Sequence, residues 1–359
     1  MSTFDRDLHD AVIAYVRDPA TARFEDLAVA VFAAQFAGVA AYRRVCERRG
    51  RTPETVVDWR EVPPVPTLAF KRVGLCTAPP ERTFLTTGTT QGAEQRGRHE
   101  MPDLRLYQAA AVAGLRSCLF PDVGAMRILS LVWSSAERPE SSLAQMTDWA
   151  IERFGNPGSR GFVNDGRFDF EALAEALRTS ERDGEPTCLL TTTGALLHFL
   201  DHCRDHDVAF RLPHGSRVMD TGGTKGAPRT MSRNGLLRAI WETFAIPGYF
   251  VVNEYGMTEL SSQFYDNVVR DRVAGRFGSR LKVGPHWVRT RALDPTALTE
   301  VPAGEVGLLC HFDLANAGSA ACVLTEDLGR MVADGFEIVG RASGAETRGC
   351  SLAAAELAP

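Results

Sequence analysis

Apolar positions along the chain form two patterns. One is the spacing typical of amphipathic helices, and the other is the short continuous run typical of buried strands. Residues 5–48 carry apolar side chains at helical spacing around 11–13 and 27–29, which predicts two amphipathic helices. The same period predicts further helices at 103–118, 142–154, 168–180, 193–206 and 233–245.

Short apolar runs between these helices predict buried strands. They lie at 128–133, 188–190, 217–220 and 249–252. From residue 280 onward the chain is strand-like, with turns at Asp294-Pro295 and Gly304-Glu305. Because strands alternate with helices and polar loops follow the strands, the pattern predicts an α/β fold.

The segment Asn253-Glu254-Tyr255-Gly256-Met257-Thr258-Glu259 directly follows the strand at 249–252. A tyrosine offers a flat face for a purine, and a glycine lets the backbone approach a ligand closely. The hydroxyl of Thr258 suits a phosphate, and the carboxylate of Glu259 suits a Mg²⁺ ion bridged to phosphate oxygens. These residues indicate a nucleotide site, with an ordinary strand-to-loop junction as the alternative.

Two loops rich in threonine and glycine precede that segment. Residues 86–92, Thr-Thr-Gly-Thr-Thr-Gln-Gly, offer the hydroxyl and backbone N–H groups that a phosphate-binding loop needs, although no Walker A sequence follows. In residues 221–226, Gly222 and Gly223 let the backbone lie flat against a planar ligand such as adenine. Taken alone, each loop also fits a simple connecting turn.

An acidic segment and an arginine follow in the C-terminal part of the chain. The carboxylate of Asp327 suits the two hydroxyls of a ribose, whereas a β-turn aspartate is the alternative interpretation. Arg341 follows Gly340, and its long cationic side chain suits contact with ribose or phosphate.

Composition narrows the class of protein. The 359 residues suffice for one large domain or two smaller ones, and 44% hydrophobic with 24% charged residues is ordinary for a globular protein. The net charge of −5 argues against a nucleic-acid-binding surface. The eight cysteines include no CxxC pair, the N-terminus is unlike a secretory signal, and no apolar run approaches the length of a membrane span. We therefore expect a cytoplasmic protein with reduced thiols and no membrane span.

Together these segments resemble the adenylate-forming superfamily of acyl-CoA synthetases, adenylation domains and luciferases. Residues 253–259 match its Asn-x-Tyr-Gly-x-Thr-Glu motif fully. From about residue 40 to 352 the chain is similar to the LuxE-type acyl-protein synthetases. The segments that carry this similarity are 64–71, 84–90, 253–266, 284–291 and 340–352.

The resemblance implies an α/β adenylate-forming domain with layered sheets and helices between and outside them. We expect this domain to span residues 1–335, with a helical lead-in at 1–50. The usual C-terminal cap domain is then reduced to a short segment, 336–359.

The resemblance also implies ATP-dependent activation of a fatty or aromatic carboxylic acid as an acyl-adenylate, with Mg²⁺, followed by transfer to a thiol. The residues it assigns to nucleotide, substrate and metal binding are Thr86, Thr87, Gly88, Thr89 and Thr90 for the phosphates, Gly222 and Gly223 for adenine and the acyl substrate, Tyr255 for adenine, Asn253 and Gly256 in the same motif, Thr258 for the α-phosphate, Glu259 for Mg²⁺, and Asp327 with Arg341 for ribose.

The chain departs from the superfamily in lacking a lysine after Lys282, where the cap lysine that stabilises charge at the α-phosphate usually lies. An arginine, Lys225 or Lys71 substitutes for it, or the step proceeds without such a charge. Cys350 fits the C-terminal acyl-carrier cysteine of LuxE-type enzymes, and the acceptor is then a protein such as an acyl reductase or carrier protein. Transfer to coenzyme A with a structural Cys350, and a non-catalytic binding relative, are the alternatives.

Three histidines, His198, His202 and His206, are spaced by four residues on one predicted helix. This spacing suits metal ligation, but no HExxH-type motif accompanies it. The sequence favours exposed helix positions.

Overall fold

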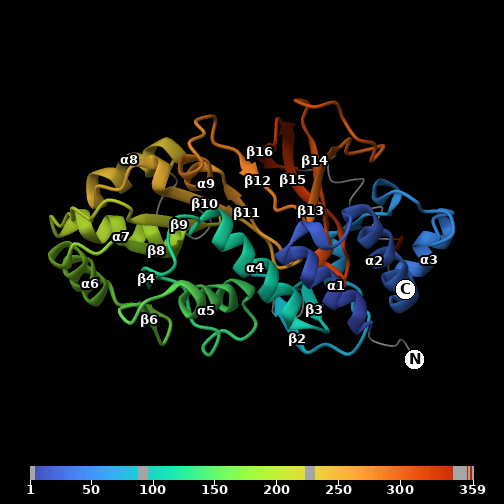
Figure 1. The fold of residues 1–359 in the computed structure, drawn as a ribbon, viewed down its shortest axis with the longest axis horizontal. Coiled ribbons are helices and arrows are strands. Elements are labelled where there is room, and N and C mark those ends of the chain that lie inside the picture. Colours follow the sequence, from blue (N-terminus) through green and yellow to red (C-terminus); the bar gives the residue numbers. More distant parts are fainter. Residues whose placement is uncertain (1–4, 88–95, 223–230, 343–353, 355, 358–359) are drawn as a thin grey trace. The chain divides into compact units, whose positions relative to one another are not determined.

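The computed structural model describes residues 5–87, 96–222, 231–342, 354 and 356–357. The chain forms two compact units. The first comprises residues 1–113, 257–263 and 281–359, and the second comprises residues 114–256 and 264–280. Figure 1 labels the helices and strands of both units.

The second unit is organised around a sheet with the strand order β5-β4-β8-β9-β10-β11. Neighbouring strands from β5 to β10 are parallel, and β11 is antiparallel to β10. The elements of this unit are β4 (Arg127–Ser130), α5 (Ser142–Phe154), β5 (Arg160–Gly161), β6 (Val163–Asn164), β7 (Arg167–Phe168), α6 (Phe170–Asp183), β8 (Thr187–Thr192), α7 (Thr193–Asp205), β9 (Arg217–Thr221), α8 (Arg233–Phe244), η5 (Gly248–Phe250), β10 (Val251–Tyr255), β11 (Phe264–Asp266) and α9 (Val268–Val273).

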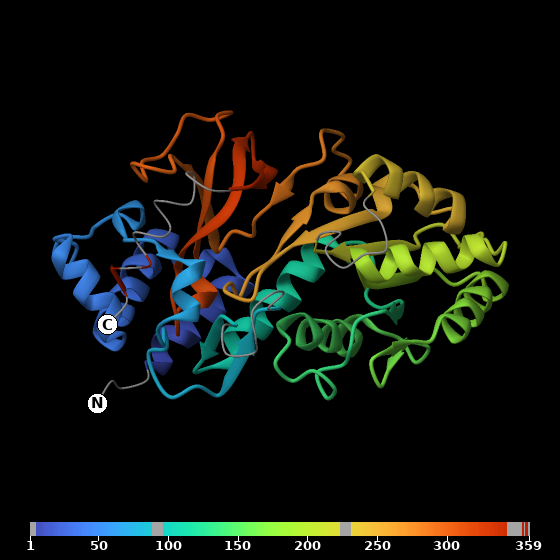
Figure 2. The same cartoon turned by 180° about the vertical axis from the view of Figure 1, so that it is seen from behind.

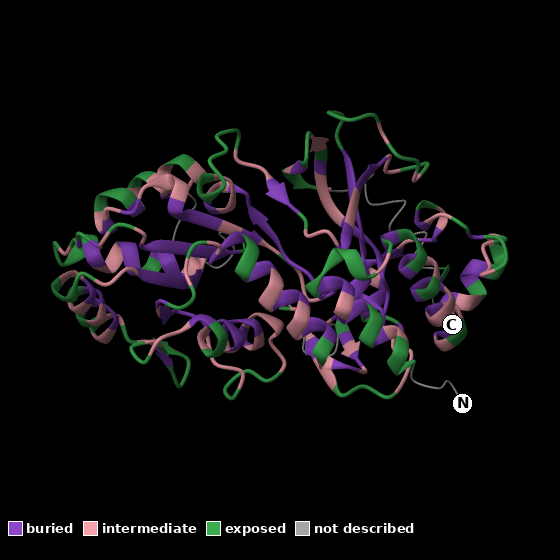
Figure 3. Ribbon diagram, in the orientation of Figure 1, coloured by how far each residue is buried: buried purple, intermediate pink, exposed green. Residues whose placement is uncertain are grey.

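The central strands of this sheet are buried along almost their whole length, which is typical of parallel strands covered by helices. All five residues of β9 are buried, as are the first five of β8 (Figure 3). Helix α5 packs against β4, and α7 packs against β8 and β9. The helices begin where the sequence supplies a capping side chain: Ser141 for α5, Asp169 for α6, Thr192 for α7 and Ser232 for α8.

The first unit contains an antiparallel sheet with the order β13-β14-β15-β16-β12, and β1 pairs in parallel with β15 (Figure 2). Its further pair is the hairpin of β2 and β3. The elements are α1 (Arg6–Arg17), η1 (Pro19–Thr21), α2 (Phe24–Gly38), α3 (Ala40–Arg48), η2 (Trp59–Glu61), β1 (Val65–Pro66), η3 (Thr67–Lys71), β2 (Arg82–Leu85), β3 (Arg98–Met101), β12 (Lys282–Val283), β13 (Val288–Leu293), β14 (Gly307–Asp313), η6 (Leu314–Asn316), β15 (Cys322–Val332) and β16 (Gly335–Arg341); α4 (Leu104–Cys118) begins in this unit and ends in the other.

The N-terminal segment forms three helices where the pattern predicts two. Helix α2 ends at Gly38, and α3 begins after Val39, whose backbone is extended. A Cβ atom at residue 38 would lie 2.9 Å from the Cβ of Thr77, closer than real atoms approach, so only glycine fits here. The apolar pattern does not reveal this close packing of the end of α2 against Thr77.

The mixed α/β class predicted from the sequence is confirmed. The predicted domain boundary between residues 335 and 336 does not coincide with the boundaries of the two compact units, and it stays a prediction. Residue 335 is the first residue of β16. Within the described residues, no single helix has the length and apolar composition of a membrane span. Helices α2 and α3 reach these values only when taken together across a bend of 110°.

Candidate functional site

A buried aspartate, Asp220 at the end of β9, organises the polar residues of the second unit. Its side chain is 1% exposed. Asp220 Oδ2 accepts hydrogen bonds from Thr193 Oγ1 at 2.9 Å and from Asn253 Nδ2 at 3.0 Å. Arg233 Nη1 donates to Asp220 Oδ1 at 2.6 Å. The buried carboxylate thereby joins the ends of three neighbouring chain segments and is paired with a cation.

The turn at Gly222 follows this aspartate by two residues, after the end of β9. Gly222 has a φ of +77°, a left-handed conformation that favours glycine. Thr193 Oγ1 lies 2.9 Å from the carbonyl oxygen of Gly222, which fixes the turn against the start of α7. The predicted adenine-binding glycine at 222 thus lies in a supported turn at a strand end, as expected for a ligand-binding loop.

The motif 253–259 is divided between the two units: residues 253–256 belong to the second and residues 257–259 to the first. In the second unit, the Asn253 side chain donates to Asp220, and its backbone N–H donates to Asp266 at 2.9 Å. The Tyr255 ring is half-buried, with its centroid 5.8 Å from that of Phe264. Asn253 therefore holds strands together, and the adenine-stacking role of Tyr255 stays a prediction.

In the first unit, Thr86 begins the loop that the sequence assigns to phosphate binding. The Thr86 N–H donates to the carbonyl of Gly97 at 2.9 Å, and the Gly97 N–H donates to Thr86 Oγ1 at 2.8 Å. Arg96 Nε donates to the carbonyl of Thr86 at 2.6 Å. These bonds close the loop at its base, and the next residue, Thr87, is exposed.

Glu259 is an 8%-exposed carboxylic acid within the same unit. Burial raises its pKa to about 7; its own backbone N–H and the charges of Lys71 and Arg341 act in the opposite direction, and Glu326 adds to the rise. A buried carboxyl with a pKa near neutral pH, under the influence of two cations, is a candidate functional residue. Its ionised form suits a divalent cation.

Thr258 is held by a residue that the sequence analysis did not identify, His99 on β3. His99 Nδ1 donates to the carbonyl of Thr258 at 2.6 Å, since a carbonyl only accepts. Burial lowers the pKa of His99 to about 4, so the ring is neutral at physiological pH. The Phe70 ring contacts the edge of His99 at 5.6 Å. His99 thus positions the turn that presents Thr258 and Glu259.

The residues after Glu259 are fixed by the end of β14. Ser262 donates twice to Asp313, from its N–H at 2.8 Å and from its hydroxyl at 2.7 Å. Asn316 Nδ2 donates to the carbonyl of Glu259 at 2.8 Å. Burial raises the pKa of Asp313 to about 6, against the hydrogen bonds from Ser262. The turn at residues 257–259 is therefore anchored on both sides.

Asp327 and Arg341 occupy directly opposite positions on β15 and β16. The sequence analysis assigns both residues to ribose, and the register places them side by side. Arg341 also pairs with Glu326 at 2.8 Å, while most of its side chain remains exposed. The N–H of Asp327 donates to Thr325 Oγ1 at 3.1 Å. The pair thus fits the predicted ribose role, which stays a prediction.

Several predicted site residues lie outside the described residues. They are Gly88, Thr89 and Thr90 of the first loop, Gly223 and Lys225 of the second, and Cys350. Gly256 is described and exposed.

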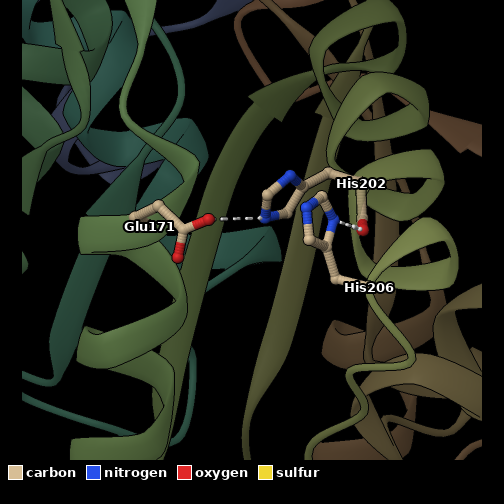
Figure 4. A group of neighbouring side chains, drawn as sticks. All are labelled: Glu171, His202 and His206. Carbon is tan, nitrogen blue, oxygen red and sulfur yellow. Dashed lines mark hydrogen bonds and ion pairs between the residues drawn. The ribbon is translucent and has the colours of Figure 1, made fainter.

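The histidine series on α7 gains a partner that the sequence did not indicate. His202 Nε2 lies 3.6 Å from a carboxylate oxygen of Glu171, which is on α6. The ligand atoms of Glu171, His202 and His206 all lie within 4.8 Å of one another (Figure 4). His198 is not part of this group, and its ring lies instead near Phe168.

A family model described as "Acyl-protein synthetase, LuxE" matches residues 8–357. Two curated proteins, each named long-chain-fatty-acid–luciferin-component ligase, are similar to the chain. The one from Aliivibrio fischeri is 22% identical over 206 residues, which are 54% of this chain and 52% of that protein. The one from Vibrio harveyi is 23% identical over 333 residues, 87% of this chain and 82% of that protein. The chain thus matches about half the length of the first relative and most of the second.

Two solved structures of 2-hydroxyisobutyryl-CoA ligase share the fold. The open conformation aligns with a TM-score of 0.58 at 15% identity, covering 88% of this chain and 69% of the ligase. The postadenylation state aligns with a TM-score of 0.59 at 14% identity, covering 88% and 67%. The predicted adenylate-forming fold is therefore confirmed.

Proposed function

Because the chain belongs to the LuxE acyl-protein synthetase family, we propose that it is an AMP-forming ligase that activates a fatty or aromatic acid and passes the acyl group to a thiol. The carboxylate attacks the α-phosphate of MgATP, which forms an acyl-adenylate and releases pyrophosphate. The thiol then displaces AMP. Incubating the protein with ATP, Mg²⁺ and an acid should yield AMP, pyrophosphate and the acyl-adenylate, each detectable by mass spectrometry.

The environment of Glu259 is the observation that carries this proposal. The ionised form of a buried carboxyl is poorly stabilised unless a nearby cation compensates its charge. Lys71 and Arg341 lower the pKa of Glu259 only through longer-range electrostatic interaction. A Mg²⁺ ion held between this carboxylate and the phosphates of ATP would supply the missing charge. In the proposed complex, Thr258 contacts the α-phosphate, Thr86 to Thr90 bind the outer phosphates, and Asp327 with Arg341 bind ribose. Gly222, Gly223 and Tyr255 bind adenine.

In the superfamily, the cap lysine supplies a positive charge at the α-phosphate. We assign this role to Lys71 in the present chain. Lys71 is exposed and ends η3. A Cβ built on Gly97, which pairs with Thr86 at the base of the phosphate loop, would lie 3.6 Å from Lys71 Cγ. Lys71 is also one of the two cations that lower the pKa of Glu259. The Lys71 side chain thus begins near the base of the predicted phosphate loop, and its charge acts on the proposed Mg²⁺ ligand.

Replacing Lys71 by methionine is expected to lower the rate of adenylate formation by about 10²–10³-fold, by analogy with the loss of one charge-stabilising donor. Lys71→Arg should retain most of the rate, because the positive charge is kept. Arg72→Met is the matched control: Arg72 is the neighbouring exposed cation, and its loss should leave the rate within about twofold. Equal rates for Lys71→Met and Arg72→Met would contradict the assignment.

We propose Cys350 as the thiol that accepts the acyl group. Acyl transfer needs a thiolate, and burial raises the pKa of the described thiols of Cys46, Cys188 and Cys203 to about 12. Burial also raises the pKa of Cys76 and Cys118 to about 11. Cys310 and Cys322 are buried on neighbouring strands, with their sulfur atoms 3.7 Å apart. None of these seven described thiols suits a carrier that must reach a protein acceptor.

A Cys350→Ser variant is expected to form acyl-adenylate at the native rate but to lose hydroxylamine-sensitive acyl label on the denatured protein. The measurement uses a labelled acid with ATP and Mg²⁺. Cys76→Ser, which changes a half-buried thiol, should keep the label. Label that persists on Cys350→Ser, or a native protein that forms only acyl-CoA when coenzyme A is added, would overturn the acyl-cysteine and leave the ligase proposal standing.

A further inference from the structure

Two helices of the second unit bring three metal-ligating side chains together. Glu171 lies in the first turn of α6, His202 lies in the last turn of α7, and His206 caps the end of α7. Their ligand atoms lie within 4.8 Å of one another (Figure 4). Two imidazole nitrogens and one carboxylate oxygen form a donor set that suits Zn²⁺ and related dications.

The two histidines are presented in the way that metal ligands require. His206 Nδ1 donates to the carbonyl of His202 at 2.8 Å, which leaves the lone pair on His206 Nε2. A hydrogen bond of this kind from the non-ligating nitrogen to a backbone carbonyl fixes the tautomer and the orientation of metal-binding histidines. Figure 4 shows the other nitrogen of His206 on the side that faces His202. The His202 ring is held between Phe170 and Phe199, at centroid distances of 5.3 and 6.1 Å.

The surroundings of the group favour a cation. Three acidic residues, Asp201, Asp205 and Asp207, flank it in sequence at the end of α7, and Arg204 pairs with two of them, Asp201 and Asp205. The cavity beside the group is lined by one further acidic and one basic residue, Asp169 and Arg167. The C-terminal end of a helix also carries a partial negative charge. A surface cavity of about 460 Å³ borders Glu171 and His202, which leaves room for water molecules to complete the coordination.

We propose that Glu171, His202 and His206 form a binding site for a transition-metal dication, with Zn²⁺ as the best-suited ion, that links α6 to α7. The ion takes one carboxylate oxygen, two imidazole nitrogens and water. Small adjustments of the side-chain torsion angles of these exposed or half-exposed residues bring the three donors to bonding distance. The role is structural and independent of the proposed ligase reaction.

The test uses untagged, full-length protein freed of metal with a chelator and titrated with Zn²⁺ in competition with a chromogenic chelator. The native protein should bind Zn²⁺ with a dissociation constant tighter than about 10 μM. His206→Ala and Glu171→Gln should weaken binding by about tenfold or more. His198→Ala is the matched control, because it removes a histidine one turn earlier on α7 that is not part of the group, and it should bind as the native protein does.

Two further readouts separate this site from others. Zn²⁺ should raise the thermal midpoint of the native protein and of His198→Ala but not that of His206→Ala, since only a ligand of the folded state stabilises it. Co²⁺ in place of Zn²⁺ should give a spectrum without thiolate bands. Binding weaker than about 10 μM, an affinity unchanged in His206→Ala, or thiolate bands with Co²⁺ would each overturn the proposal.

Discussion

Glu259→Gln is expected to lower the rate of acyl-adenylate formation by about 10³-fold or more, because a neutral amide replaces the carboxylate proposed to hold Mg²⁺. The same change should stabilise the protein without ligands. Burial raises the pKa of Glu259 from 4.5 when exposed to about 7 in the folded protein. Between pH 4.5 and 7 the carboxyl is ionised in the unfolded chain but still protonated in the folded protein, so the free energy of unfolding falls as pH rises through this range. Below about pH 4.5 the carboxyl is protonated in both states and does not affect the free energy of unfolding.

Above pH 7 the glutamine variant should therefore unfold at higher denaturant, by up to about 3 kcal/mol in free energy, and below pH 4.5 it should match the native protein. Glu305→Gln, at an exposed position of the same unit, should change neither rate nor stability. A Glu259→Gln protein that is less stable than the native one at pH 8 would indicate a structural ion pair and contradict the role in metal binding.

The native enzyme should show the same group in its pH dependence. Protons and Mg²⁺ compete for the carboxylate, so activity at low Mg²⁺ should fall as pH drops through about 7. Raising Mg²⁺ should move this midpoint to lower pH. If the midpoint does not change with Mg²⁺ concentration, the titrating group is a residue other than Glu259.

Asp220→Ala is expected to cause the largest loss of stability, about 3 kcal/mol or more, because it removes a buried carboxylate that is the shared acceptor of one buried and two half-buried donors. These donors are on Thr193, Asn253 and Arg233. The thermal midpoint should fall by about 6–12 °C, given the size of the second unit.

The control for this change is Glu242→Ala, which removes an exposed ion pair with Arg238 on α8. It should cost less than about 0.5 kcal/mol, as surface pairs do. Asp220→Asn should fall between the two, because an amide keeps one acceptor and the shape but not the charge. Equal midpoints for Asp220→Ala and Glu242→Ala would show that the buried network contributes little.

The local features of the candidate site agree with the sequence pattern only in part. The turn at Gly222 follows the predicted strand at 217–220. The strand predicted at 249–252 is instead β10 (Val251–Tyr255), which contains Asn253, and Asp327 lies within β15 and not in a loop at a strand end. The side-by-side position of Asp327 and Arg341 also agrees with their common predicted role.

The supports of the site could not be predicted, since their partners are distant in sequence. His99 contacts Thr258 across 159 positions, and Asp313 contacts Ser262 across 51. An apolar period indicates that a residue is buried but not which residue it meets. The same holds for Glu171, because the spacing of histidines on α7 carries no information about α6.

Carboxylate-dependent exchange of pyrophosphate into ATP tests the central claim most directly. The native protein, with Mg²⁺ and labelled pyrophosphate, is assayed against a panel of fatty and aromatic acids, with Glu259→Gln as the inactive reference. We expect exchange that depends on one class of acid and is absent without acid or in the variant. A native protein that binds ATP but supports no exchange with any acid would contradict it and favour a binding protein with the fold of a ligase.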